Sequence, residues 1–260
     1  MFNNNKIEVT SYGILSDKVK NGVVIAHLSD LHEKEFGIKN HRLFEEVEAL
    51  QPDLIAVTGD MVAHENQKNI NRQYTRDFAR GIAQIAPAYF VTGNHERNFH
   101  PAVEEIMDDY GVKVITGGIR QAQIGETIIN ISGMDDVSYE SADVLESVDV
   151  FRGTQDGFNL FLAHRPEYYP VYLRKNIDLI LAGHTHAGQI RFPKFGTFAM
   201  SGQGFMPKYL EGEFTDGQTT MIISRGLGSS GYPAIRINNP PDLVAVYVEP
   251  EPAAQFAVSI

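Results

Sequence analysis

Five short apolar segments of this sequence end in residues of the types that can bind metal ions or transfer protons. Each segment has the pattern of a buried strand, and the polar residues that follow the five strands are Asp30 and His32; Asp60; Asn94, His95 and Glu96; His164; and His184 and His186. Imidazole, carboxylate and amide oxygen form a borderline-hard ligand set that suits manganese, iron, zinc or magnesium better than copper(I). Because ligands of open α/β sheets bind at the carboxyl ends of strands, we expect these five strand ends to lie together.

Seven of these side chains are candidate metal ligands, too many for one tetrahedral ion: Asp30, His32, Asp60, Asn94, His164, His184 and His186. The count favours a two-metal site. Each pattern taken alone also fits a structural role. Asp60 could be a helix N-cap, for example, and His164 could be a buried core histidine. The occurrence of all five patterns in this order, each at a strand end, favours metal binding.

The elements that must position these residues alternate along the chain. Apolar runs predict strands at 23–28, 54–59, 88–93, 158–163, 177–182, 219–224 and 242–248. Helical spacing of apolar residues predicts helices within 41–52, 74–85 and 102–111. Three short runs between 112 and 133, separated by glycine-containing turns, are typical of antiparallel strands, and 209–217 has the composition of a loop. The mixture predicts an α/β protein with two packed mixed sheets and helices outside.

The composition excludes several kinds of site. The chain of 260 residues has no cysteine, which excludes a disulfide framework, a thiolate zinc site and a cysteine nucleophile. Its net charge of −11 argues against a broad basic surface for long nucleic acid. Bound cations would supply the positive potential that a phosphate needs.

The sequence also bears on location and domain organisation. No stretch approaches the roughly 18 apolar residues of a membrane span, and the first residues do not resemble a signal peptide. We therefore expect a cytoplasmic protein, with peripheral membrane or envelope association if an N-terminal anchor has been removed. We expect one domain over residues 1–260, with its core at about 22–248 and a loosely ordered tail at 249–260.

In their order and in their residues the five motifs resemble those of the calcineurin-like metallophosphoesterases. The motifs are "DLH", "GD", "GNHE", a lone histidine after a strand, and "GHTH". The resemblance implies a four-layer α/β/β/α sandwich with a binuclear metal centre. "GHTHAGQIRFP" and "SRGLGSSGYPAIRINNPPDL" further resemble the branch of bacterial phosphodiesterases that contains envelope-associated and UDP-diacylglucosamine-hydrolysing members.

The resemblance also implies a role for each residue. The ligands of one metal would be Asp30, His32 and His186, those of the other Asn94, His164 and His184, and Asp60 would bridge the two. His95, beside a ligand, would be the acid that protonates the leaving group. Two divalent cations would share a water, lower its pKa and place hydroxide in line with phosphorus.

We therefore expect a binuclear metal-dependent phosphodiesterase that acts on a small phosphoester, such as a lipid-linked or nucleotide diester. A phosphomonoesterase or nuclease with the same site is an alternative, and a catalytically silent metal-binding scaffold is an alternative from a different class. Arg225 and Arg236 flank the "GLGSSG" loop and are candidate substrate-binding residues, although arginines that only pack on a loop would fit as well.

Overall fold

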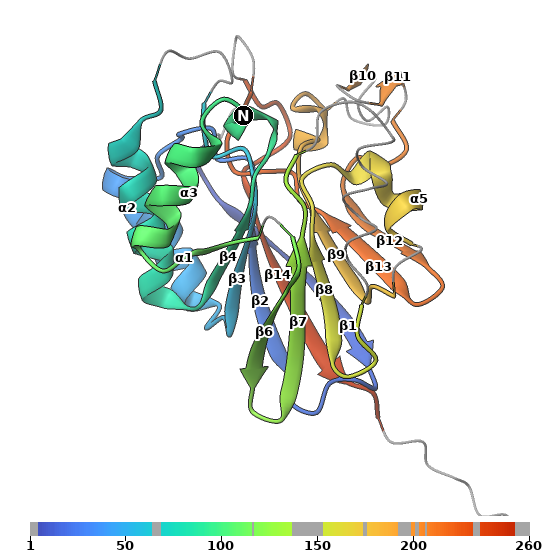
Figure 1. Cartoon of the computed structure of the whole chain (residues 1–260). Coiled ribbons are helices and arrows are strands. Elements are labelled where there is room, and N and C mark those ends of the chain that lie inside the picture. The colour runs from blue at the N-terminus through green and yellow to red at the C-terminus, as the bar shows by residue number, and fades with distance from the viewer. Residues whose placement is uncertain are drawn as a thin grey trace, which may run out of the picture.

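The strands of this protein form two six-stranded mixed sheets with helices on their outer faces (Figure 1). The computed structural model describes residues 5–63, 69–115, 117–136, 153–173, 176–191, 199–200, 203–205, 207–230 and 235–252. The predicted α/β class with two packed mixed sheets is confirmed.

The first sheet carries three of the five predicted strand ends. Its strand order is β1 (Glu8–Ser16), β14 (Asp242–Pro250), β2 (Val23–Leu28), β3 (Leu54–Thr58), β4 (Ala88–Val91) and β5 (Lys113–Val114). The pairs β2–β3, β3–β4 and β4–β5 are parallel, as is β1–β14, whereas β14 runs antiparallel to β2. The carboxyl ends of β2, β3 and β4 therefore meet at one edge of the sheet.

The second sheet carries the other two strand ends. Its strand order is β12 (Gly212–Asp216), β13 (Thr219–Ile223), β9 (Leu179–Ala182), β8 (Phe158–Leu162), β7 (Thr127–Gly133) and β6 (Ile119–Ile124). The four central strands are parallel, and β12 and β6 are antiparallel strands at the edges. A separate short pair joins β10 (Ala199–Met200) to β11 (Gly204–Phe205).

Helices cover the outer faces of both sheets. In Figure 1, α1 (His41–Ala49), α2 (Arg72–Ile85) and α3 (His100–Asp109) lie against the first sheet, and the short α5 (Tyr169–Tyr172) lies beside the second. The α2 helix begins at Asn71, whose side chain accepts a hydrogen bond from the backbone of Tyr74. It buries Tyr74, Phe78 and Ile82, which are four residues apart and so share one face.

Alternation along the strands divides the apolar core into three layers. On β3, Ile55 and Val57 join the cluster under the helices, whereas Leu54 and Ala56 join the cluster between the two sheets. On β9, Leu179 and Leu181 belong to the layer between the sheets, and Ile180 and Ala182 face the cluster that contains α5. Strands buried on both faces explain the continuous apolar runs of the sequence.

Some of the sequence-based element predictions were wrong. The run at 112–116 was expected to pair antiparallel with its successors, but β5 joins the first sheet parallel to β4, and only β6 and β7 form the predicted hairpin. The expected loop at 209–217 contains β12. No strand was predicted at 8–16, where β1 pairs with β14 in a register that aligns Glu8 with Asp242. The β1 and β5 strands pair with strands that are not their neighbours in sequence, which local patterns do not reveal. The β12 strand pairs with its neighbour β13, and it was missed because its short, mostly exposed sequence "GEFTD" lacks an apolar run.

The carboxyl-terminal segment was expected to be a tail from residue 249. The structure includes Glu249 and Pro250 in β14, and residues 253–260 lie outside the described residues. Within the described part of the chain, no helix is long and apolar enough to cross a membrane.

Candidate metal centre

All seven predicted ligands lie just beyond carboxyl ends of parallel strands, as the sequence indicated. The ends of β2, β3 and β4 provide Asp30, His32, Asp60 and Asn94, and the ends of β8 and β9 provide His164, His184 and His186. The structure brings the side chains from both sheets together. The first group of possible ligands is Asp30, His32 and His186, and the second is Asp60, His164 and His184; His32, Asp60 and His95 form an overlapping set between them. Within each set the possible ligand atoms lie within 4.8 Å of one another.

The backbone at these positions adopts a conformation that side chains normally avoid. Five of the seven residues have φ between 47° and 70°: Asp30, His32, Asp60, His184 and His186. A non-glycine residue in the left-handed region costs about 1–2 kcal/mol. Such strain persists only where the surrounding structure imposes it, and it is concentrated at functional sites. The turns after the strands therefore direct the polar side chains into one place at the expense of local stability.

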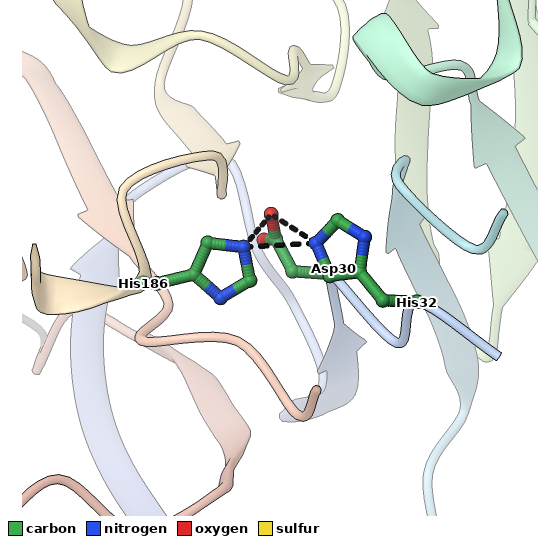
Figure 2. A group of neighbouring side chains, drawn as sticks. All are labelled: Asp30, His32 and His186. Atoms are coloured by element: carbon green, nitrogen blue, oxygen red, sulfur yellow. Dashed lines mark hydrogen bonds and ion pairs between the residues drawn. The ribbon is translucent and has the colours of Figure 1, made fainter. Parts of the chain in front are cut away.

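The first group joins Asp30 to two histidines (Figure 2). Asp30 Oδ1 lies 3.3 Å from His186 Nε2 and 3.9 Å from His32 Nε2, and the two histidine nitrogens are 2.9 Å apart. Nδ1 of His32 lies 3.2 Å from the carbonyl oxygen of Val62 and donates to it, so the Nε2 lone pair faces the group. An outer hydrogen bond of this kind is what orients imidazole ligands in metal sites.

The second group is built around His164. Its Nδ1 donates to the carbonyl of Thr58 at 2.7 Å, which turns Nε2 toward Asp60 Oδ2 at 3.3 Å, Asn94 Oδ1 at 3.2 Å and His184 Nδ1 at 3.1 Å. The four ligand atoms converge without an apolar side chain between them. Hard oxygen and imidazole nitrogen donors in this proportion fit a divalent first-row ion.

Asp60 lies between the two groups. Its Oδ2 is 3.8 Å from His32 Nε2 in the first group and 3.3 Å from His164 Nε2 in the second. Its Oδ1 accepts a hydrogen bond from the backbone N–H of His95 at 2.9 Å. The carboxylate therefore lies within 4 Å of one histidine from each ligand group.

His95 lies at the exposed side of the cluster. Its Nδ1 is 3.1 Å from the carbonyl oxygen of Ala63 and donates to it, and its ring packs edge-on against that of His32. Nε2 therefore faces the site, 3.8 Å from Asp60 Oδ2. Nε2 is therefore the ring nitrogen that could transfer a proton to a substrate.

Burial and mutual charge set the protonation of the cluster. Burial lowers the pKa of His32 to about 4 and that of His184 and His186 well below the usual value, so these imidazoles are neutral. Burial raises the pKa of Asp30 to about 6. Burial also opposes charge on Asp60 and His164, but their attraction outweighs it, lowering the pKa of Asp60 and raising that of His164 to about 10.

Glu96 is a supporting residue that the sequence analysis did not assign. It is fully buried, and its carboxylate accepts hydrogen bonds from the backbone N–H groups of Asp60, Gly93 and Val62 at 2.8, 2.7 and 2.9 Å. It thus ties the loop after β3 to the loop after β4. The only feature of the sequence that could have indicated this role was a carboxylate directly after the "GNH" that follows the strand.

Close approach of backbone and side chains explains two of the glycines at the site. A Cβ at Gly183 would lie 1.9 Å from Ser29 Oγ and 2.4 Å from Asp30 Oδ2. A Cβ at Gly93 would lie 2.2 Å from Asp60 Oδ1. Any side chain at these positions would displace a candidate ligand.

Arg165, next to His164, is another residue that the sequence analysis did not single out. Its guanidinium pairs with both carboxylate oxygens of Asp136, and its Nη1 lies 3.2 Å from His184 Nε2. The Arg165 guanidinium therefore lies beside Nε2 of His184, and Nδ1 of the same ring faces His164.

The two arginines proposed for substrate bind protein groups in this structure. Arg225 Nη2 lies 2.9 Å from both Asp242 Oδ1 and Glu8 Oε2. Arg236 is buried, donates to the carbonyl oxygens of Arg225, Gly228 and Asn239, and lies 3.4 Å from His186 Nδ1. Arg236 thus backs the first group of ligands, whereas Arg225 ties the start of the loop to the first sheet.

Comparison with known proteins adds an independent observation. The family model described as calcineurin-like phosphoesterase matches residues 23–188, a range that contains all seven candidate ligands and His95. The chain belongs to the calcineurin-like phosphoesterase family. This confirms the resemblance drawn from the five motifs. The family is one of metal-dependent phosphoester hydrolases, and the His and Asp groups of this member could hold metal ions.

Several relatives of this family member span most of its length. The metallophosphoesterase YkoQ of Bacillus subtilis (strain 168) is 26% identical over 84% of this chain and 81% of its own. A metallophosphoesterase of Aquifex aeolicus (strain VF5) is 27% identical over 94% and 92% of the two chains. Phosphodiesterase YaeI of Escherichia coli (strain K12) is 28% identical over 79% and 75%.

Proposed function

We propose that this protein is a binuclear metal-dependent phosphodiesterase. The observation that carries the proposal is the position of Asp60, whose Oδ2 faces His32 in one ligand group and His164 in the other. A carboxylate shared in this way is what a two-metal site needs. The proposed ligands of one ion are Asp30, His32 and His186, those of the second are Asn94, His164 and His184, and Asp60 is common to both.

Two divalent ions held by these residues would supply a water of lowered pKa as the nucleophile and positive charge to offset that of the phosphate. The side chains of the protein then have separate tasks. Glu96 holds the Asp60 and Gly93 loops at a fixed separation through its three backbone hydrogen bonds. Neutral imidazoles at His32, His184 and His186 add no positive charge that would compete with a cation.

His95 is the proposed general acid. Nδ1 is anchored on the Ala63 carbonyl, so Nε2 is the atom that would donate a proton to the departing alkoxide. Its side chain retains 13% of its exposure, whereas those of His32 and His164 retain 1% or less. Of these three imidazoles, His95 is therefore the one that a leaving group could reach. Arg225 and Arg236 already bond protein groups, and the proposed reaction assigns them no step.

A diester is the proposed substrate class because the relative YaeI is named a phosphodiesterase. Small lipid-linked or nucleotide diesters suit a chain of net charge −11 better than long nucleic acid does.

The experiment is hydrolysis of bis(p-nitrophenyl) phosphate by purified protein reconstituted with Mn²⁺, beside p-nitrophenyl phosphate and a chelated sample. Parallel reconstitutions with zinc and iron would identify the ion. Diester turnover that chelation abolishes, with the monoester slower, is the expected result. Faster monoester turnover would replace the proposal with a phosphomonoesterase. Two bound ions without turnover of either ester or of a panel of nucleotide and lipid diesters would favour a silent scaffold.

A further inference from the structure

His27 is a buried histidine in the middle of β2 that the proposed reaction does not use. It has no exposed surface, and its Nε2 lies 2.8 Å from Thr58 Oγ1 on the neighbouring strand β3. Its Nδ1 has no hydrogen-bond partner within the described residues. Burial lowers the pKa of His27 to about 3, so the ring is neutral and carries a single N–H. A buried polar ring of this kind needs an explanation beyond packing.

Two hydroxyl groups connect His27 to the candidate metal centre. Thr58 Oγ1 lies 2.8 Å from Ser29 Oγ, and Ser29 Oγ lies 2.6 Å from Asp30 Oδ2. The direction of the chain follows from its carboxylate end, because an ionised carboxylate only accepts. Ser29 must donate to Asp30, Thr58 then donates to Ser29, and His27 donates its Nε2–H to Thr58.

The direction matters because the Ser29 hydroxyl has a second acceptor. The carbonyl oxygen of Thr58 lies 3.3 Å from Ser29 Oγ and already accepts from His164 Nδ1 at 2.7 Å. When Thr58 donates to Ser29 Oγ, it occupies the side of that oxygen which faces β3 and leaves the Ser29 proton for Asp30. Without that donation, the proton could turn to the carbonyl, and Asp30 Oδ2 would lose its hydroxyl partner.

We propose that His27, Thr58 and Ser29 form a hydrogen-bond relay that positions Asp30, with Oδ2 held by the relay and Oδ1 left to a cation. Asp30 Oδ1 is the oxygen nearest His186 Nε2, at 3.3 Å. The backbone N–H of His184 contacts both carboxylate oxygens, at 3.1 and 3.0 Å, so it does not by itself choose between them. The hydrogen bond from Ser29 at the end of the relay distinguishes the two oxygens, because it binds Oδ2 only. His27 is thus a positioning residue, and the inference rests on the proposed function because Asp30 must bind a cation.

The relay acts on one ion of the proposed pair, and this allows a sharp test. Mn²⁺ would be titrated into the full chain and free ion measured by electron paramagnetic resonance, with Asp30→Asn defining the signature of the first ion. Thr58→Val removes the hydroxyl while nearly keeping the shape. We expect it to weaken that same ion about 10- to 100-fold, the usual effect of losing an outer-shell partner, and to leave the second within about threefold. Thr58→Ser restores the hydroxyl and should restore the affinity.

The far end of the relay is tested at His27. His27→Gln keeps an N–H donor and should bind both ions within about threefold of the natural chain. His27→Leu removes the donor and should match Thr58→Val. Ile55→Val, a buried change outside the relay on β3, the strand that carries Thr58, is the control for loss of packing. Ser29→Ala, which removes only the last donor, replaces Thr58→Val if that variant does not fold.

Each outcome separates the relay from the proposed function. Two ions in the natural chain with unchanged affinity in Thr58→Val and Ser29→Ala would overturn the relay alone. Equal weakening of both ions, also seen in Ile55→Val, would reduce the three residues to packing and overturn it as well. Failure of the natural chain to bind two ions would overturn the proposed binuclear site itself.

Discussion

Replacement of Asp60 by asparagine is the most informative single change at the candidate metal centre. Asparagine keeps the size of the side chain and one oxygen, so the 2.9 Å hydrogen bond from the His95 backbone can persist and hold the loop. The amide nitrogen would replace Oδ2, which lies 3.8 Å from His32 Nε2 and 3.3 Å from His164 Nε2. The change therefore removes a carboxylate from both ligand groups without removing the side chain.

The change should affect both metal binding and folding. Loss of a supporting outer-shell group costs 10- to 100-fold in metal affinity, so loss of a direct ligand should cost at least about 100-fold, or about 2.7 kcal/mol, for each of the two ions. The free energy of unfolding of the metal-free protein should fall by about 1.5–3 kcal/mol, the range for one hydrogen bond to a charged group, here the pair with His164. The pKa of His164, now about 10, should fall once the carboxylate is gone, because burial lowers it and Asp60 is the largest of the groups that raise it.

The assay is metal content after dialysis against limiting Mn²⁺, with urea unfolding of the same preparations. Asp30→Asn should lose one ion and Asp60→Asn two. Asp53→Asn is the matched control, because its carboxylate accepts a hydrogen bond from Val24 at the opposite end of β2, away from the ligands. Two ions of natural affinity in Asp60→Asn would refute the bridging role. Loss of a single ion would place Asp60 in one site only.

Three further changes test other parts of the argument. His95→Ala should keep both ions and lose about 10²- to 10⁴-fold in turnover of alkyl diesters, with a much smaller loss on p-nitrophenyl diesters; equal losses on both would contradict an acid role. Glu96→Gln leaves at least one of three buried backbone N–H groups without an acceptor, so the free energy of unfolding in urea should fall by about 2–4 kcal/mol. An unchanged unfolding midpoint would contradict the role of Glu96 in joining the two loops. The pKa of His27 is about 3 in the folded protein and about 6.5 in the unfolded chain. Below pH 6.5 the unfolded chain therefore binds a proton that the folded protein does not, so the stability present above that pH is lost as the pH falls. Between pH 6.5 and 5 the chelated natural protein should lose about 1.5–2 kcal/mol that His27→Gln does not lose, and parallel curves would be inconsistent with the lowered pKa.

The residue types at strand ends were readable from the sequence because they are local signals. A buried apolar run followed by Asp30 and His32, or by His184 and His186, specifies a strand, its carboxyl end and the chemistry placed there within about ten residues. Parallel strands place their carboxyl ends on one edge of a sheet, so the meeting of three motifs in the first sheet and of two in the second followed from the α/β class. The packing of the two sheets, which brings these two edges together, was decided by the tertiary structure. The family motifs are assembled from the same local signals.

The tertiary structure alone decided the partners of those residues. The Ser29 hydroxyl bonds Thr58, which is 29 positions away, and Asp30 meets the backbone of His184, which is 154 positions away. Nothing in the sequence near Arg236 indicates that its guanidinium is buried against backbone carbonyls, and nothing near β5 indicates which sheet it joins. A buried polar group must be satisfied wherever the fold supplies a partner, and that partner is set by long-range packing. The sequence by itself therefore determined which side chains do the chemistry, whereas only the folded chain decided what holds them in place.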